Sequence, residues 1–303
     1  IGTGDWSSDV CSSDLIITGA NASGNGGGIL NRESVTLRNS TLSGNTANRG
    51  GAIYNRTATL IINNSTLSGN SATDVTAGGG AILNNGSTAS ISNSTISGNS
   101  GSRGGGFYNY NSTLTLNNST ISGNSAVSGS GGGFSIRGGS TLTLNNSTIS
   151  GNSTSSRGGG IYNFGSNANI SNSTITGNSA ANTGGGIINR IGGTVTLSNS
   201  IVANSVLGVD VANIDISSGS VVNTTGVNII EDGSKTGTNI LNVDPLLGDL
   251  QDNGGPTFTH ELLAGSPAIG AADNTQLPTE TDLGIDVDGD GTIESTVISV
   301  DQR

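Results

Sequence analysis

The most reactive side chain of the sequence is the thiol of Cys11, the only cysteine of the chain. It lies in the stretch DWSSDVCSSDL at residues 5–15, beside the only tryptophan and three carboxylates, Trp6, Asp5, Asp9 and Asp14. A thiol among carboxylates can serve as a nucleophile once deprotonated, can bind a metal ion, or can have no chemical role. The rest of the chain has to decide among these three readings.

A second candidate for chemistry is the stretch DVDGDGTIE at residues 286–294. It matches the first half of an EF-hand-type loop, with carboxylates at positions 1, 3 and 5, glycine at position 6 and Glu at position 9. Position 12 is Val297, so the usual bidentate carboxylate is missing. The pattern predicts a weak calcium site, the alternative being an acidic surface turn, and the expected ligands are Asp286, Asp288, Asp290, Thr292 and Glu294.

The elements that must position such residues come from a repeat with a period of 24–29 residues. One motif, typified by NSTISGN, occurs at residues 39–45, 64–70, 93–99, 118–124, 146–152, 172–178 and, in decayed form, 199–205. A second motif, typified by GGGIYN, occurs at residues 26–31, 50–55, 79–84, 104–109, 131–136, 158–163 and 184–189. Seven copies of two alternating motifs predict a stack of similar units.

The composition and the apolar pattern together predict the architecture of each unit. Gly makes up 51 of 303 residues and aromatic residues only 3%, so few large side chains are present to fill a globular core. Apolar residues alternate with a period of 2, which indicates strands, and a unit this small must stack on its neighbours to bury its inward face. We therefore expect an all-β, right-handed parallel β-helix of about seven rungs with three short strands per rung, a rod of about 34 Å.

The repeat also predicts which side chains point inward and where the chain turns. In the second unit Ile53, Leu60, Ile62 and Leu67 are expected inside, and the corresponding aliphatic residues of the other units follow. The last Asn of each NST-type motif is expected at a turn, in left-handed backbone geometry, with its amide hydrogen-bonded along the rod. These residues are Asn45, Asn70, Asn99, Asn124, Asn152 and Asn178.

If the residue directly after each glycine run points inward, two columns of side chains point outward on the same face. They contain tyrosine and arginine, which can hold a polysaccharide by ring stacking and hydrogen bonds. Phe164, between Arg137 and Arg190, can make cation–π contacts across rungs. A solvated or loop-covered face is the simpler alternative. The candidate ligand residues are Arg32, Tyr54, Arg56, Tyr108, Tyr110, Arg137, Tyr162, Phe164 and Arg190.

Catalysis is not expected. Enzymes built on β-helices, such as pectate lyases and polygalacturonases, gather several carboxylates on adjacent rungs. The repeats contain only Glu33 and Asp74, at different repeat positions, and the single histidine, His260, has no evident nucleophile beside it. Nucleic acid is also a poor candidate, because eight scattered arginines form no dense basic patch and the net charge is −11.

Two segments resemble known families. The motifs GGAIYN (residues 50–55) and GGAILN (79–84), paired with SGN, are similar to the repeats of polymorphic outer-membrane proteins and related bacterial surface β-helices. Residues 244–273, DPLLGDLQDNGGPTFTHELLAGSPAIGAAD, resemble the segment that closes the helix in bacterial surface proteins of the choice-of-anchor type, and DQR at 301–303 resembles the start of that family's next motif. The resemblance implies a secreted or surface location.

The segment DWSSDVCSSDL shares nothing with the repeat. Its codons can be written so that they spell an adapter oligonucleotide used in high-throughput DNA sequencing, ending within the codon of Leu15. We therefore interpret residues 1–14 as a non-native, disordered scar, which removes the Cys11 thiol from the functional candidates. The other expected parts are the β-helix repeats at 15–205, closing rungs with a cap segment at 206–273, and an acidic, truncated tail at 274–303.

The sequence thus predicts a bacterial β-helix protein, secreted or surface-anchored, with a structural or adhesive role and no catalysis. The alternative is a carbohydrate-binding or degenerate polysaccharide-processing β-helix that uses the arginine and aromatic face. We expect a monomer and a cell-surface or polysaccharide ligand, with calcium as the one cofactor. Residue 1 is not Met, so we also expect a fragment whose envelope anchor lies in a missing segment.

Overall fold

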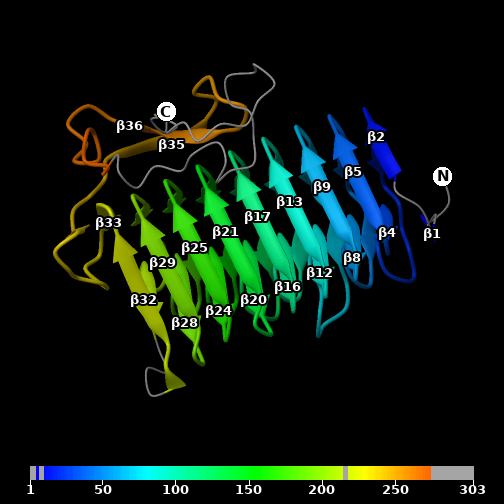
Figure 1. Ribbon diagram of the computed structural model, residues 1–303, viewed down its shortest axis with the longest axis horizontal. Helices are drawn as coiled ribbons and strands as arrows, with labels where there is room; N and C mark the ends of the chain where they lie inside the picture. Colours follow the sequence, from blue (N-terminus) through cyan, green and yellow to red (C-terminus); the bar gives the residue numbers. More distant parts are fainter. Residues whose placement is uncertain (1–4, 7–9, 214–217, 274–303) are drawn as a thin grey trace.

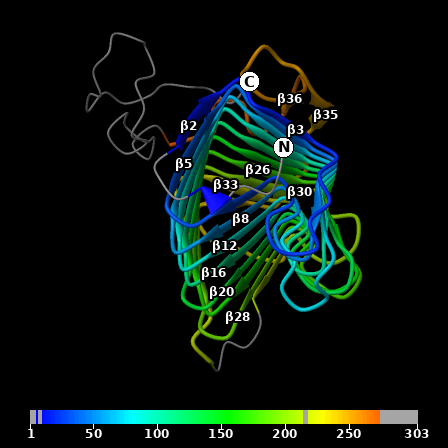
Figure 2. The same cartoon turned by 90° about the vertical axis from the view of Figure 1, so that its right-hand side faces the viewer.

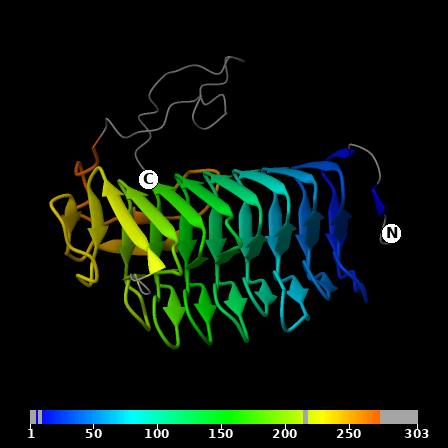
Figure 3. The same cartoon turned by 60° about the horizontal axis from the view of Figure 1, so that its bottom comes forward.

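The computed structural model describes residues 5–6, 10–213 and 218–273. Within them the chain winds through successive turns, and each turn contributes one strand to each of three long parallel sheets, in agreement with the expected three strands per rung. The rungs lie in a single row from the N-terminal to the C-terminal part (Figures 1 and 3). Figure 2, turned by 90°, shows the rungs stacked behind one another around a common interior.

Sheet A contains the strands that begin directly after the glycine runs. Its nine strands are β1 (Asp5–Trp6), β4 (Ile29–Asn31), β8 (Ile53–Arg56), β12 (Ile82–Asn85), β16 (Phe107–Tyr110), β20 (Phe134–Arg137), β24 (Ile161–Phe164), β28 (Ile187–Arg190) and β31 (Val211–Asn213).

Sheet B contains the TLTL-like strands, which face the viewer side by side in Figure 1. Its nine strands are β2 (Val10–Ser13), β5 (Ser34–Arg38), β9 (Thr59–Asn63), β13 (Thr88–Ser92), β17 (Thr113–Asn117), β21 (Thr141–Asn145), β25 (Asn167–Ser171), β29 (Thr194–Ser198) and β32 (Val221–Thr225).

Sheet C contains the STIS-like strands. Its ten strands are β3 (Ile16–Thr18), β6 (Thr41–Ser43), β10 (Thr66–Ser68), β14 (Thr95–Ser97), β18 (Thr120–Ser122), β22 (Thr148–Ser150), β26 (Thr174–Thr176), β30 (Ile201–Ala203), β33 (Asn228–Ile230) and β34 (Ile240–Leu241).

Six rungs carry a fourth strand that the sequence pattern does not predict. These two-residue strands follow the SGN turn and form sheet D, which contains β7 (Thr46–Ala47), β11 (Ser71–Ala72), β15 (Ser100–Gly101), β19 (Ser125–Ala126), β23 (Ser153–Thr154) and β27 (Ser179–Ala180). A strand of two residues shows only one inward position, so it leaves no alternation to read. Its inward residue is small, as in Ala47 and Ala126, each at most 1% exposed.

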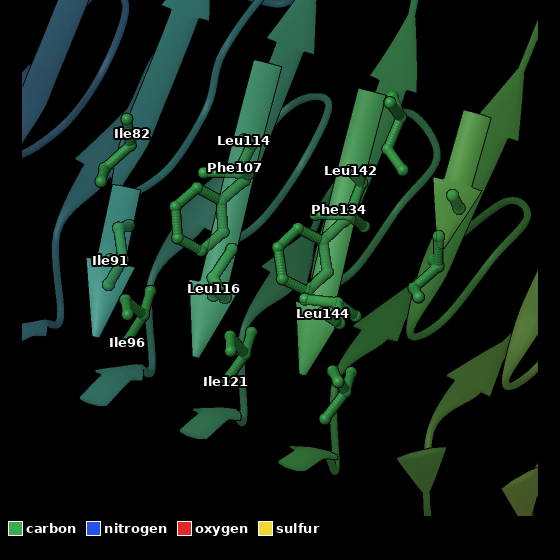
Figure 4. Packing of buried hydrophobic residues seen from close by; sticks show 14 of the residues in the cluster. Ile82, Ile91, Ile96, Phe107, Leu114, Leu116, Ile121, Phe134, Leu142 and Leu144 are labelled. Carbon is green, nitrogen blue, oxygen red and sulfur yellow. The ribbon is translucent and has the colours of Figure 1, made fainter. Parts of the chain in front are cut away.

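The aliphatic residues predicted to point inward form one continuous buried cluster along the rod. In the second unit Ile53, Leu60, Ile62 and Leu67 are fully buried, as expected. Figure 4 shows how equal positions of successive rungs stack: the rings of Phe107 and neighbouring Phe134 lie 5.0 Å apart with planes 6° from parallel. The small rung is thus completed by stacking, as the repeat predicts.

The predicted amide ladder is present inside the rod. The Nδ2 of Asn45 donates to Oδ1 of Asn70 (3.0 Å), and the same bond links Asn70 to Asn99 (2.9 Å) and Asn99 to Asn124 (2.9 Å). It continues through Asn152 to Asn178, and all six side chains are at most 1% exposed. From Asn70 onward each Oδ1 also accepts the backbone N–H of the Asn one rung earlier, as Asn99 does for Asn70 (2.9 Å).

The predicted left-handed geometry of these asparagines is wrong. Positive φ occurs instead at the preceding glycine, for example Gly98 (φ 61°), and at the first Asn of each NST triplet, for example Asn93 (φ 49°). Glycine adopts this geometry without steric cost, which leaves the following Asn in an ordinary backbone conformation with its side chain directed inward.

The N-terminal segment also differs from the expectation. Residues 10–13 form β2, which pairs in parallel with β5 and sets Val10 opposite Val35, and residues 5–6 form β1 opposite β4. The prediction that residues 1–14 are disordered is therefore wrong for these described residues. Backbone hydrogen bonds of a ladder need no particular side chain, so an extended segment of any origin can pair with an open strand edge. The origin of the segment stays a prediction.

The region after residue 205 has two parts. The strands β31 to β34 continue the stack, and then β35 (Leu247–Gln251) and β36 (Thr259–Leu262) form an antiparallel hairpin. The hairpin lies along the flank of the rod, across several rungs (Figure 1). Its hydrogen bonds reach sheet C at Thr120 and Ser150, whereas a cap would cover the end of the rod.

Candidate functional site

The first outward column of sheet A is covered. Parallel pairing aligns Leu30, Tyr54, Leu83, Tyr108, Ser135, Tyr162 and Ile188 in one row. Tyr54, Tyr108 and Tyr162 are only 3%, 7% and 3% exposed, because they pack on their neighbours in the row and on residues such as Ala77 from the loop before β12. These three rings therefore offer no face for stacking on a sugar, contrary to the expectation.

The second outward column of sheet A is the accessible one. Pairing aligns Arg56, Asn85, Tyr110, Arg137, Phe164 and Arg190. Arg32, Arg56 and Tyr110 are exposed, with 42% of Tyr110 accessible, and Arg137, Phe164 and Arg190 are half-buried. The sequence-predicted ligand residues thus divide into a packed row and an open row, and only the open row can meet a ligand directly.

Arg137, in the open row, contacts two aromatic rings and a hydroxyl group. Its guanidinium carbon lies 4.7 Å from the ring centroid of Tyr162 and 5.1 Å from that of Phe164. Its Nε donates a hydrogen bond to the Oγ of Ser135 (3.3 Å). The two rings are themselves stacked, 6.1 Å apart. The predicted cation–π contacts between rungs are present, with Arg137 as the cation.

An ion pair occupies a different part of the same face. The Nε of Arg49 lies 2.6 Å from Oδ2 of Asp74, across one rung. Hydrogen bonds from the hydroxyl and the backbone N–H of Thr76, followed by the bond from Arg49, hold the pKa of Asp74 well below its usual range. The bond to Asp74 likewise raises the pKa of Arg49, which also interacts with Tyr54.

A shallow groove of about 520 Å³ runs along the rod where sheet A turns into sheet B. It crosses several rungs, and its lining is rich in hydroxyl groups, with Asn111 as its one amide side chain and Glu33 as its one acidic residue. The members of the lining include Thr59, Ser87, Thr88, Asn111, Ser112, Thr113 and Thr141. Tyr110 directly precedes Asn111 on this lining, and its ring lies over Gly138 of the next rung. Sequence reasoning missed this groove because its walls are turn residues without a distinctive motif.

His260 has a structural environment. Its Nδ1 lies 2.7 Å from the carbonyl oxygen of Gly248, and its Nε2 lies 2.9 Å from the Oγ of Ser150. The ring therefore joins the two strands of the hairpin to sheet C. Glu33 lies in the groove and Asp74 in the ion pair, so the two carboxylates of the repeat region have separate surroundings.

Two carboxylates meet near the C-terminal rungs. Oδ2 of Asp210 accepts the backbone N–H of Asp232 (3.1 Å), and Oδ2 of Asp232 accepts that of Asp210 (2.8 Å). Asp210 is only 1% exposed, and burial raises its pKa. Across residues 5–6, 10–213 and 218–273, no three His, Cys, Asp or Glu side chains gather as a metal site would require. The predicted calcium ligands Asp286, Asp288, Asp290, Thr292 and Glu294 lie outside the described residues.

In the part of the chain that the structure describes, no helix has the length and apolarity needed to cross a membrane.

Comparison with known proteins addresses the fold. The chain matches no curated protein and no solved structure. The sequence model of the right-handed β-helix region matches residues 10–171, which is more than half of the chain and begins at β2. This match agrees with the parallel stacking of three sheets and confirms the expected right-handed winding. The chain therefore belongs to the right-handed β-helix family.

Proposed function

We propose that this chain is a rigid β-helical rod of a bacterial surface or secreted protein, with a structural or adhesive role and no catalysis. The observation that carries the proposal is the set of side-chain ladders inside the rod. The amide ladder from Asn45 to Asn178 continues through every rung it crosses, and a serine ladder runs beside it from Ser40 to Ser200. Such ladders fix the spacing of the rungs, which suits a protein that serves as a spacer or stalk.

Surface accessibility on intact cells tests the location. The complete open reading frame that contains this chain is expressed with an epitope inserted after Gly24, where an added Cβ atom would have no neighbour within 4 Å. Antibody binding to intact cells, or recovery of the product from the medium, is the expected result. Antibody binding that requires cell lysis would contradict the proposal. An epitope-tagged cytoplasmic protein of the same strain serves as the control for lysis.

The second candidate function is carbohydrate binding, and the groove between sheets A and B supports it. Its hydroxyl and amide groups can exchange hydrogen bonds with sugar hydroxyls, and the exposed ring of Tyr110 offers a stacking surface at its edge. The test is a screen of the whole chain against immobilised glycans. We expect Y110A to weaken binding about tenfold. Y54A, which changes a covered ring, should leave glycan binding unchanged. Absence of binding by the unmodified chain would exclude this candidate.

A further inference from the structure

The guanidinium of Arg137 has a fixed orientation without an ionic partner. The rings of Tyr162 and Phe164 hold its plane, and Ser135 accepts its Nε–H. Among the described residues no carboxylate forms an ion pair with it. An arginine has five N–H donors, so the bonds of Arg137 to Ser135 and Tyr162 leave further donors for another acceptor. The position of Ser135 in a row of larger side chains provides the room in which Arg137 lies.

A second positive charge, on Arg103, belongs to the adjacent rung, where it directly precedes the glycine run before β16, the strand paired with β20 of Arg137. Burial lowers the pKa of Arg137, and the charge of Arg103 lowers it further, whereas Tyr162 and Tyr108 act in the opposite direction. Arg103 itself is half-buried and has no ion-pair partner among the residues that the structure describes. Two partly desolvated like charges repel each other, and a bound anion removes that repulsion while it accepts their charge-assisted hydrogen bonds.

Arg49 is an example of an arginine whose charge is neutralised by a carboxylate of the same chain. Arg49, Arg103 and Arg157 occupy the same repeat position, directly before a glycine run. The rung after Arg49 supplies Asp74, which lies 2.6 Å from it. The rung after Arg103 has the sequence SAVSGSG at residues 125–131, which contains no acidic residue. The repeat therefore compensates Arg49 from within the chain and provides no equivalent carboxylate for Arg103.

We propose that Arg103 and Arg137, with the hydroxyl of Ser135, bind an oxyanion carried by a glycan, either the carboxylate of a uronic acid or a sulfate ester. The planar guanidinium of Arg137 matches the geometry of both groups, since each offers two oxygens to parallel N–H donors. Phe164 and Tyr110 flank Arg137 in the open row and provide apolar surface for the attached sugar ring. This inference rests on the carbohydrate-binding candidate above and adds the charge of its ligand.

Calorimetric titration of the whole chain tests the site with four probes. These are inorganic sulfate, an oligogalacturonate, a sulfated oligosaccharide and a neutral oligosaccharide of similar length. We expect sulfate to bind and R137Q or R103Q to weaken anion binding about tenfold or more, because each removes charge-assisted hydrogen bonds. R49Q, which changes the compensated arginine, is the matched control and should change the affinity less than twofold. The two anionic oligosaccharides distinguish a carboxylate from a sulfate ligand.

The possible outcomes separate the two proposals. No heat from sulfate or from either anionic oligosaccharide overturns the oxyanion site, as does an equal loss with R49Q and R137Q. Binding of the neutral oligosaccharide alone, unaffected by R137Q, overturns the site and supports the groove as a glycan site. Sulfate binding that depends on Arg137, without binding of either anionic oligosaccharide, overturns the proposal that a glycan carries the oxyanion. R103Q leaves the stacked rings untouched, so it tests the site even if R137Q does not fold.

Discussion

At the scale of single residues, the interior of this rod depends on buried amides as well as on aliphatic side chains. A second amide ladder, in sheet A, joins Asn31 to Asn55 (2.7 Å), Asn55 to Asn84 (2.7 Å) and Asn84 to Asn109 (2.8 Å). It is interrupted in β20, where Ile136 takes the place of Asn. Buried polar groups are tolerated when their hydrogen bonds are made, and the stack supplies each amide with partners above and below.

Replacement of a central ladder residue is expected to destabilise the rod strongly. Asn99→Ala removes the acceptor for both the backbone N–H and the Nδ2 of Asn70, and both donors remain buried. Because each unsatisfied donor costs about 1–3 kcal/mol, we expect a loss of about 3 kcal/mol in the free energy of unfolding, measured by denaturant titration. The control is Asn169→Ala on the exposed face of sheet B, with a change below about 0.5 kcal/mol. Equal effects of the two substitutions would refute a structural role for the ladder.

The pKa values of two aspartates are expected to be shifted in opposite directions. The pKa of Asp74 is lowered by hydrogen bonds from Thr76 and Arg49, so its contribution to stability is present at neutral pH and is lost on acidification. The pKa of Asp210 is raised by burial, so its protonated form is favoured in the folded state. Its contribution is present below the ordinary Asp pKa and is lost as the pH rises through the raised value. Carboxyl carbon NMR should place the pKa of Asp210 above that of Asp74, and T76A should raise the pKa of Asp74 alone.

At the scale of elements, the glycine runs allow adjacent rungs to approach closely. A Cβ atom on the middle glycine, such as Gly105, would collide with the carbonyl oxygen of Gly132 in the next rung and with the backbone of Ser125. The run thus places the start of each sheet A strand directly against sheet D. Any side chain at this position would have to move backbone atoms of two rungs.

The substitution Gly105→Ala tests this close approach. We expect it to lower the midpoint of thermal unfolding by several degrees, because the added methyl group meets backbone atoms that cannot move independently. Gly24→Ala is the matched control, since its Cβ would have no neighbour within 4 Å and its backbone does not have positive φ. Similar midpoints for the two variants would show that the rungs can separate without cost.

The hairpin of β35 and β36 is held to the rod by a few polar contacts. Thr120 is 1% exposed, and its Oγ1 donates to the carbonyl oxygen of Phe258 (2.5 Å). Thr257 in turn donates to the carbonyl oxygen of Asn118 (3.3 Å). Outward threonines of earlier rungs, such as Thr95, are half-buried and make no such contact with the hairpin. The same substitution can therefore be compared at a threonine of sheet C that the hairpin covers and at one that it does not cover.

Thr120→Val should loosen the hairpin while keeping the shape of the side chain. Loss of one hydrogen bond of about 1 kcal/mol predicts up to about fivefold faster amide exchange at Leu262 and Leu263, provided that the hairpin opens locally. Thr95→Val, at the same repeat position outside the hairpin, is expected to leave exchange there unchanged. Unchanged exchange in both variants would mean that apolar contacts alone hold the hairpin.

At the scale of the whole molecule, the sequence predicted the features that repeat and failed for those that occur once. The repeat correctly predicted that Leu60 and Ile62 are buried, because the same apolar alternation recurs in each rung. The burial of Tyr108 depends on how a loop packs over sheet A, and the path of the hairpin depends on contacts distant in sequence, so neither leaves a periodic signal. The groove could not be predicted for the same reason, since it exists only where several turns align.

Calcium is expected to stabilise the chain through residues 286–294. Titration of the whole chain with millimolar CaCl₂ should release heat and raise the midpoint of thermal unfolding, because Asp286, Asp288 and Asp290 provide hard oxygen ligands. D288N should weaken this effect about tenfold, whereas D249N, which changes an acidic residue of β35, should not. A response to calcium that D288N leaves intact would assign the ion to another part of the chain.

The ladder from Asn45 to Asn178 has one further consequence. Every rung offers the same acceptors to the rung before it and the same donors to the rung after it, through bonds of 2.9–3.0 Å. A whole unit can therefore be duplicated or deleted while the ladder continues across the new junction. The length of the rod becomes an inheritable variable that changes in steps of about 4.8 Å, while the ends and the hairpin stay the same.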